Sequence, residues 1–245
     1  MSDNDSGVRI EVVDKAEDLV QGFDCVSEAF GRQARDAIWQ AMNPGWDTPE
    51  GRARGAARFQ KRWAGATKDK DGRANTVFVK ASLPDSERKG EPRVVGVAIW
   101  VQLSVVPGHG GVPTSDLRQE LEERYPGNTS EQRHLSQALD SLHARRVEVV
   151  KEKAAASPPA VMVLDLCAVD PAFQRRGIAA KLVQWGLDEA KRRGGLEALT
   201  EASVMGRRVY VKLGFQQEGP EIQYHVDEEF KQRDMPSNIF MRTGA

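Results

Sequence analysis

The stretch that decides the fold is Leu164-Asp165-Leu166-Cys167-Ala168-Val169-Asp170-Pro171-Ala172-Phe173-Gln174-Arg175-Arg176-Gly177-Ile178-Ala179-Ala180. The apolar run 161–169 is bounded by prolines on both sides and predicts a strand that is buried on most of its surface. From Ile178 the apolar residues recur at three- and four-residue steps, through Leu182 and Ala190, which predicts an amphipathic helix. Gly194-Gly195 predicts the end of that helix.

The loop 174–177, between this strand and this helix, has the features of an anion site. The first amides of a helix have no intrahelical partners and carry about half a positive charge, which attracts phosphate. Gly177 allows the backbone to approach an anion closely, and Arg175 and Arg176 add positive charge at the rim. The small residues Ala179 and Ala180 keep the first helical turn open.

Two segments of the chain carry a resemblance to a known family. Gln174-Arg175-Arg176-Gly177-Ile178-Ala179 resembles Q/R-x-x-G-x-G/A, the acetyl-CoA pyrophosphate motif of the GNAT acyltransferase superfamily. Downstream, Tyr210-Val211-Lys212-Leu213-Gly214-Phe215 is similar to the family's Tyr-x-x-x-Gly-Phe segment. The resemblance covers residues 160–216. It implies an α/β fold in which a mixed, mostly antiparallel central sheet is flanked by helices.

Composition limits the class of protein. The chain has 245 residues, of which 40% are hydrophobic and 29% charged, so it is long enough to bury a sizeable core. The formal net charge of −1 leaves no electrostatic footprint for nucleic acid or an anionic membrane. We therefore expect neither as a partner.

Residue usage also favours one compartment. The two cysteines, Cys25 and Cys167, belong to no cluster with metal-ligand spacing, which fits a reducing compartment. The polar, acidic start of the chain lacks the features of a secretory signal, and no apolar run approaches the length of a membrane span. We expect a cytoplasmic protein, with the nucleus as the alternative.

Patterning predicts the remaining elements. An apolar stripe through Leu19, Phe23 and Phe30 predicts a helix that ends at Gly31, and Thr48-Pro49 predicts the capped start of another. The aromatic stretch 38–47 between them lines an acceptor pocket or belongs to the core, with Trp39 and Trp46 as its large side chains. A short helix is expected at 206–213. Further strands are expected at 8–13, 76–81, 94–103, 196–202, 218–226 and 237–242.

The segment 107–159 is the least expected part of the chain, because the family usually has a short connection there. It predicts a helix at 116–125 and a longer one that begins with a capping box of Thr129 and Gln132. This inserted helical hairpin packs near the acceptor side or covers a sheet edge. We expect residues 8–245 to form a single domain and 1–7 to be a disordered tail.

The resemblance implies where acetyl-CoA binds. Its pantetheine is expected along the strand edge formed by Leu166, Cys167, Ala168 and Val169, and its pyrophosphate on residues 174–180. Ser203 occupies a place where many members have an asparagine that contacts the cofactor.

Amine acetylation requires a deprotonated amine, a donor for the oxyanion and an acid for the leaving thiolate. Tyr210 matches the family tyrosine that commonly supplies the acid. Asp165, Glu201 or an ordered water is the candidate base, since both carboxylates lie in otherwise apolar strands. Cys167 as a covalent nucleophile would need a partnered histidine, which no motif provides, and the histidines show no metal spacing.

The leading hypothesis is therefore an N-acetyltransferase that uses acetyl-CoA as co-substrate, without a metal, by direct attack in a ternary complex. Its acceptor is expected to be a small-molecule primary amine, with a peptide amine as the alternative. The alternative is a non-catalytic protein: a GNAT-like domain that binds acyl-CoA without transferring the acyl group and acts as a sensor or scaffold.

Overall fold

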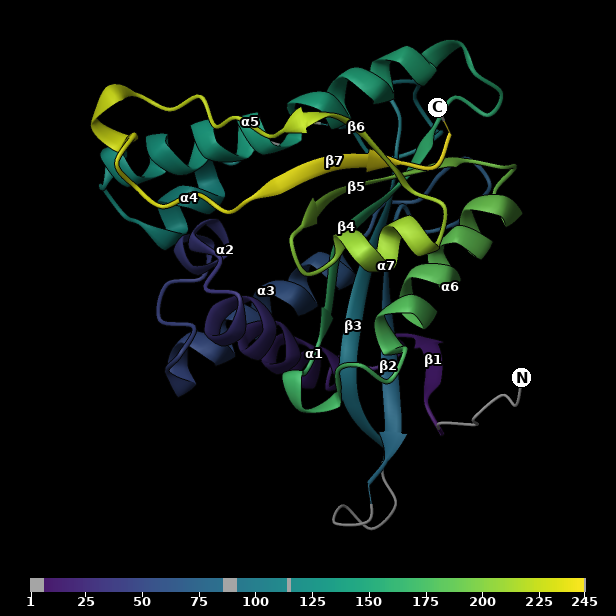
Figure 1. Cartoon of the computed structure of the whole chain (residues 1–245), viewed down its shortest axis with the longest axis horizontal. Coiled ribbons are helices and arrows are strands. Elements are labelled where there is room, and N and C mark those ends of the chain that lie inside the picture. The colour runs from purple at the N-terminus through teal and green to yellow at the C-terminus, as the bar shows by residue number, and fades with distance from the viewer. Residues whose placement is uncertain (1–6, 86–91, 114–115, 245) are drawn as a thin grey trace.

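The structure, a computed structural model, describes residues 7–85, 92–113 and 116–244. Within these ranges one seven-stranded sheet forms, with strand order β1-β2-β3-β4-β5-β7-β6 (Figure 1). Its strands are β1 (Arg9–Val12), β2 (Thr76–Pro84), β3 (Pro92–Leu103), β4 (Val161–Val169), β5 (Glu197–Ser203), β6 (Gln216–Glu221) and β7 (Asn238–Arg242). β4 and β5 run parallel, and the other neighbouring pairs are antiparallel. The predicted fold class is confirmed.

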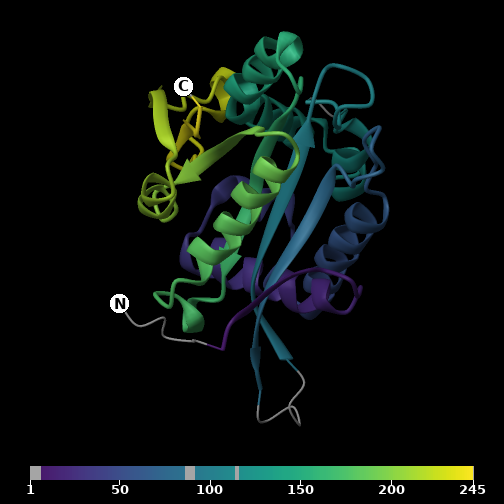
Figure 2. The same cartoon turned by 90° about the vertical axis from the view of Figure 1, so that its right-hand side faces the viewer.

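Helices cover both faces of the sheet (Figures 1 and 2). They are α1 (Asp18–Val26), α2 (Ala37–Met42), α3 (Pro49–Ala64), α4 (Arg118–Arg124), α5 (Thr129–Glu152), α6 (Ile178–Arg192) and α7 (Arg207–Lys212). A π-helix, η1 (Ser27–Gln33), continues α1, and short 3-10 turns occupy η2 (Lys153–Ala155), η3 (Pro171–Phe173) and η4 (Glu228–Phe230). α6 lies on one face, with α1 and α3 on the other (Figure 2).

The core accordingly has two parts, one on each face. Trp100 of β3 packs with Leu182 of α6 on the first face, and Phe78 of β2 packs with Leu19 of α1 on the second. β3 is buried almost continuously from Val94 to Leu103 because both of its faces are covered. Burial of this apolar surface is the main favourable contribution to folding.

Local signals place several boundaries where the sequence predicts them. Thr48 accepts a hydrogen bond from the amide of Gly51 at 3.1 Å, and Pro49 is the first residue of α3. After α6, Gly194 and Gly195 both adopt positive φ, which glycine tolerates without strain. The expected strand at 218–226 is correct only in part, because β6 ends at Glu221.

The expected end of the first helix at Gly31 is wrong. The chain continues as a π-helix to Gln33, which brings the side of η1 to the end of β4. Gly31 has a packing role instead, since a Cβ atom there would lie 2.5 Å from the ring of Trp46. The absence of a side chain, rather than a helix stop, is what this position requires.

Helices α4 and α5 occupy the segment 107–159, with residues 114–115 outside the described part. The predicted capping box is wrong, because Asn128 is the cap and accepts a hydrogen bond from the amide of Glu131 at 3.1 Å. α5 packs against α2, β5 and β7, and its residues Val149 and Val150 are buried in the core. The insertion is therefore integrated with the sheet.

The expected tail at 1–7 lies outside the described residues, apart from Gly7. Across the described ranges, no helix combines the length and apolar character needed to cross a bilayer.

Candidate active site

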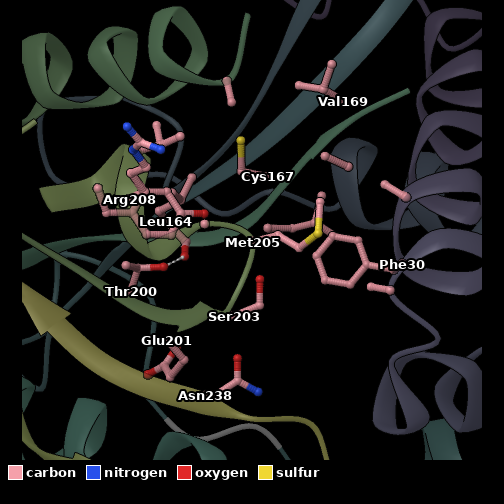
Figure 3. A pocket seen from close by; sticks show the side chains of 18 of the residues that line it. Phe30, Leu164, Cys167, Val169, Thr200, Glu201, Ser203, Met205, Arg208 and Asn238 are labelled. Carbon is pink, nitrogen blue, oxygen red and sulfur yellow. Dashed lines mark hydrogen bonds between the residues drawn. The ribbon is translucent and has the colours of Figure 1, made fainter. Parts of the chain in front are cut away.

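The site begins where two parallel strands separate. β4 and β5 pair only over Val161–Val163 and Glu197–Leu199. Beyond these residues Thr200 donates a side-chain hydrogen bond to the carbonyl of Leu164 at 3.0 Å (Figure 3). The register of β4 against β3 also shifts at this point, so that Asp165 is an extra residue in the ladder. The separation and the bulge together turn the edge of β4 toward a cavity.

The cavity has a volume of about 880 Å³ and is lined by η1, α5, β4, β5, α7 and the start of α6. Figure 3 shows Cys167, Ser203, Met205 and Phe30 around the same space. The predicted site residues that line it are Asp165, Leu166, Cys167, Ala168, Val169, Gln174, Arg175, Gly177, Ile178, Ala179, Ala180, Glu201, Ser203 and Tyr210. Arg176 does not line it. Its guanidinium lies 5.2 Å from the ring centroid of Phe173 instead.

The loop before α6 has the backbone of an anion cradle. Gly177 is the cap of α6 with φ 77°, and no side chain caps the first amides of the helix. An added Cβ atom at Gly177 would meet no atom within 4 Å, so this side of the loop is open. Arg175 also adopts a left-handed conformation, with φ 63°. Uncapped amides at an open helix N-terminus fit a phosphate group.

Gln174 fixes this loop to η1. Its amide nitrogen donates to the carbonyl of Val169 at 3.0 Å and to the side chain of Gln33 at 2.8 Å. Gln33 donates back to Gln174 at 3.0 Å. The side chain of Gln174 therefore holds the loop in place.

Tyr210 and Cys167 approach each other across the cavity. Burial raises the pKa of Tyr210 well above its ordinary value, and the neighbouring thiol of Cys167 adds to the effect. Tyr210 is therefore a protonated hydroxyl, which can donate. Burial also raises the pKa of Cys167 to about 12. A thiol that stays protonated at neutral pH is a poor nucleophile, which disfavours covalent catalysis by Cys167.

The two candidate carboxylates form a chain of charges with two arginines. Asp165 accepts hydrogen bonds from Arg62 of α3 at 2.8 Å and from Arg146 of α5 at 2.7 Å. Glu201 accepts from Arg146 through Nε at 3.0 Å and also through Nη2. The side chain of Arg146 is 7% exposed and that of Glu201 is 5% exposed. Arg146 thus joins α5 to both β4 and β5 inside the protein.

This pairing affects the proton affinity of Asp165. Burial by itself raises the pKa of Asp165, but the charges of Arg62 and Arg146 outweigh burial and hold the pKa well below its ordinary range. The same carboxylates outweigh the desolvation of Arg146 and raise its pKa. Asp165 is therefore a permanently charged partner of two arginines, and each of its oxygens already accepts a hydrogen bond.

Comparison with known proteins gives the family. Residues 141–215 match the sequence profile described as "Acetyltransferase (GNAT) family", which spans both segments that carry the predicted resemblance. This part of the chain is therefore a GNAT acetyltransferase domain by sequence. No curated protein matches it in sequence.

Several solved structures share the fold of this chain at low sequence identity. Arylalkylamine N-acetyltransferase 2 from Aedes aegypti has a TM-score of 0.60 at 17% identity, over 97% of this chain and 98% of that one. A polyamine N-acetyltransferase from Drosophila melanogaster has a TM-score of 0.53 at 14% identity, over 96% and 97%. A "histone acetyltransferase HPA2 and related acetyltransferase" from Corynebacterium glutamicum has 0.51 at 20%, over 97% and 96%.

Several residues that line the cavity are not predicted by the sequence patterns. Leu142, His143 and Arg146 come from α5, Asp36 follows η1, and Asn238 pairs with Ser203 across β7 and β5. Arg146 had a signal, because it lies four residues after Leu142 and three before Val149, on the apolar stripe of its helix. The others are brought to the cavity by tertiary packing.

The aromatic stretch before α3 belongs to the core. Trp39 packs against Phe23, Phe30 and Trp46, with ring centroids 6.0, 6.3 and 5.9 Å apart. Neither tryptophan lines the cavity, whereas Phe30 does. Of the two readings of this stretch, the core is correct. Among the described residues no group of three or more His, Cys, Asp or Glu has the arrangement to hold a metal ion.

Proposed function

We propose that this GNAT chain is an N-acetyltransferase that transfers an acetyl group from acetyl-CoA to a primary amine. The observation that carries the proposal is the combination of an open, uncapped helix N-terminus at Gly177 with a strand edge that opens into one continuous cavity. The first fits the pyrophosphate, and the second fits the pantetheine arm and thioester.

The chain's own residues have separate tasks in this proposal. Acetyl-CoA supplies the activated thioester. The backbone of 166–169 holds the pantetheine and polarises the thioester carbonyl near Cys167, and the amides of 177–180 hold the phosphates. Tyr210 donates its hydroxyl proton to the departing thiolate. The amine attacks directly in a ternary complex, since the protonated thiol of Cys167 is a poor nucleophile.

A small amine is the proposed acceptor. Structural neighbours with the same fold are named as enzymes of arylalkylamines and polyamines. Side chains of α5 and β7 line one part of the cavity, and a lined pocket of this size suits a small molecule. We also propose that residues 8–245 act as one domain, and that the free thiols of Cys25 and Cys167 fit a cytoplasmic location.

A bulky residue in the loop tests the cofactor site. We expect Gly177→Val to raise the acetyl-CoA dissociation constant roughly 10–100-fold, because the new side chain blocks charge-assisted hydrogen bonds from the loop amides. Isothermal titration calorimetry measures the effect. Gly195→Val is the matched control, because Gly195 has φ 78° and equally open surroundings at the other end of α6. If both variants lose affinity equally, or if neither loses affinity, the loop assignment is contradicted.

The proposed function is tested by mass spectrometry of the acceptor. The purified protein is incubated with acetyl-CoA and a panel of arylalkylamines, polyamines and lysine peptides. An N-acetylated product from one class supports the transferase. Tight acetyl-CoA binding without any acetylated product supports the alternative, a sensor or scaffold that binds acyl-CoA.

A further inference from the structure

A histidine of the inserted helix α5 lies at the acceptor end of the cavity. His143 lines the cavity and lies three residues before Arg146, which places both on one face of α5. Its ring is close enough to Arg146, Glu201 and Asp165 for their charges to act on it. His143 is therefore near the point where β4 and β5 separate.

The imidazole of His143 is not engaged by the protein. Considering residues 7–85, 92–113 and 116–244, it forms no hydrogen bond or ion pair. Its ring nitrogens are also not sealed inside the protein, in contrast to Nε2 of His134, which is buried without a partner. His143 thus presents a free ring to the cavity.

The carboxylates near His143 already take part in hydrogen bonds. The oxygens of Asp165 and Glu201 already accept hydrogen bonds from guanidinium groups. Asp36 is the main rival, because burial raises its pKa, although one of its oxygens accepts the amide hydrogen bond that caps α2, at 2.9 Å. A base needs an available lone pair and a pKa near the working pH.

The surroundings of His143 keep it neutral. Burial lowers its pKa below the ordinary value of 6.5, and the charge of Arg146 on the same helix acts in the same direction. Glu201 of β5, Asp165 of β4 and Asp140 of α5 oppose this shift without cancelling it. At neutral pH the ring therefore carries an unprotonated nitrogen.

We propose that His143 is the general base of the proposed acetyl transfer. The amine nitrogen uses its lone pair to form a bond to the thioester carbonyl carbon, and its released proton passes to His143, directly or through one water. The carbon–sulfur bond then breaks, and the thiolate takes the proton of Tyr210. The proton held by His143 then passes through solvent to the Tyr210 phenolate. The net products are one amide and one thiol. This inference rests on the proposed function.

The test is the pH dependence of kcat with both substrates saturating, from about pH 5 to about pH 9. Protonation removes the base, so kcat of the wild type should fall toward acid pH, with a midpoint below the ordinary histidine value of about 6.5. His143→Gln should lower kcat roughly a hundredfold at neutral pH, lose the acid limb and retain its affinity for acetyl-CoA. His225→Gln, at an exposed histidine outside the cavity, should behave as the wild type.

Two further variants separate a base from a structural residue. His143→Ala should regain activity when imidazole is added, which a merely structural role does not explain. Asp36→Asn should keep the acid limb. Full activity of His143→Gln, or loss of the limb in Asp36→Asn alone, overturns the inference while leaving the transferase intact. A wild type that acetylates no amine overturns the inference and the proposed function together.

Discussion

Replacing Arg146 by methionine should lower the free energy of unfolding by about 3–5 kcal/mol. Arg146 is the common partner of Asp165 and Glu201, and methionine retains much of its apolar volume without its charge. The loss arises because one carboxylate is left buried and unpaired, which costs more than the pair itself contributes. For a chain of this size the melting temperature should fall by roughly 10 °C, measured by differential scanning calorimetry.

The neighbouring arginine provides the control. Arg145 pairs with Glu148, Glu152 and Glu218, but its side chain is 33% exposed. Arg145→Met should therefore cost about 1 kcal/mol or less. Adding Glu201→Gln to the Arg146 variant should recover most of the loss, because Asp165 still pairs with Arg62 and no buried carboxylate is left unpaired. A single variant as stable as the wild type would contradict the buried charge chain.

Replacing Tyr210 by phenylalanine should slow kcat roughly a hundredfold or more and leave acetyl-CoA affinity unchanged. The ring packs against Phe215 with centroids 5.8 Å apart, and phenylalanine preserves that packing. Only the hydroxyl proton offered to the thiolate is lost. Steady-state kinetics and calorimetry, on the same preparation, separate the two effects.

Tyr125→Phe is a suitable comparison, because this hydroxyl donates to the carbonyl of Ala41 at 2.6 Å and does not line the cavity. It should cost about 1 kcal/mol of stability and no activity. If Tyr210→Phe retains full kcat, Tyr210 is not the acid, and water must protonate the thiolate.

Local patterns predict well the strand, loop and helix that form the proposed cofactor site. The strand 161–169, the glycine at position 177 and the stop at Gly194-Gly195 are governed by residues close together in the sequence. The strand pattern, the helix pattern and the glycine positions therefore all predict the same local structure in this segment. The same reasoning predicts Thr48 and Pro49 at the start of α3.

The proposed acceptor half of the site depends on contacts between distant segments, which local sequence patterns do not report. Arg146 meets Asp165 and Glu201 only after α5 has packed across β5 and β7. The sequence shows two carboxylates in apolar strands and leaves their partners open. Trp39 and Trp46 illustrate the same difficulty. A tryptophan suits both the lining of a pocket and the core, so the residue type alone does not distinguish the two.

The predicted N-cap of α5 is wrong for a local reason. Asn128 and Thr129 are adjacent good caps, and Asn is at least as favourable as Thr. The chain turns at Gly127, with φ 67°, immediately before Asn128 caps the helix. Sequence propensity alone does not choose between two adjacent residues that are both good N-caps.

Release of coenzyme A thiol from acetyl-CoA, followed in the presence and absence of each amine, tests the central claim most directly. We expect thiol release that depends on a primary amine, with one acetylated amine formed for each thiol, and a strong reduction in Tyr210→Phe. Thiol release that ignores the amine, or none with any acceptor despite saturating acetyl-CoA, would contradict it.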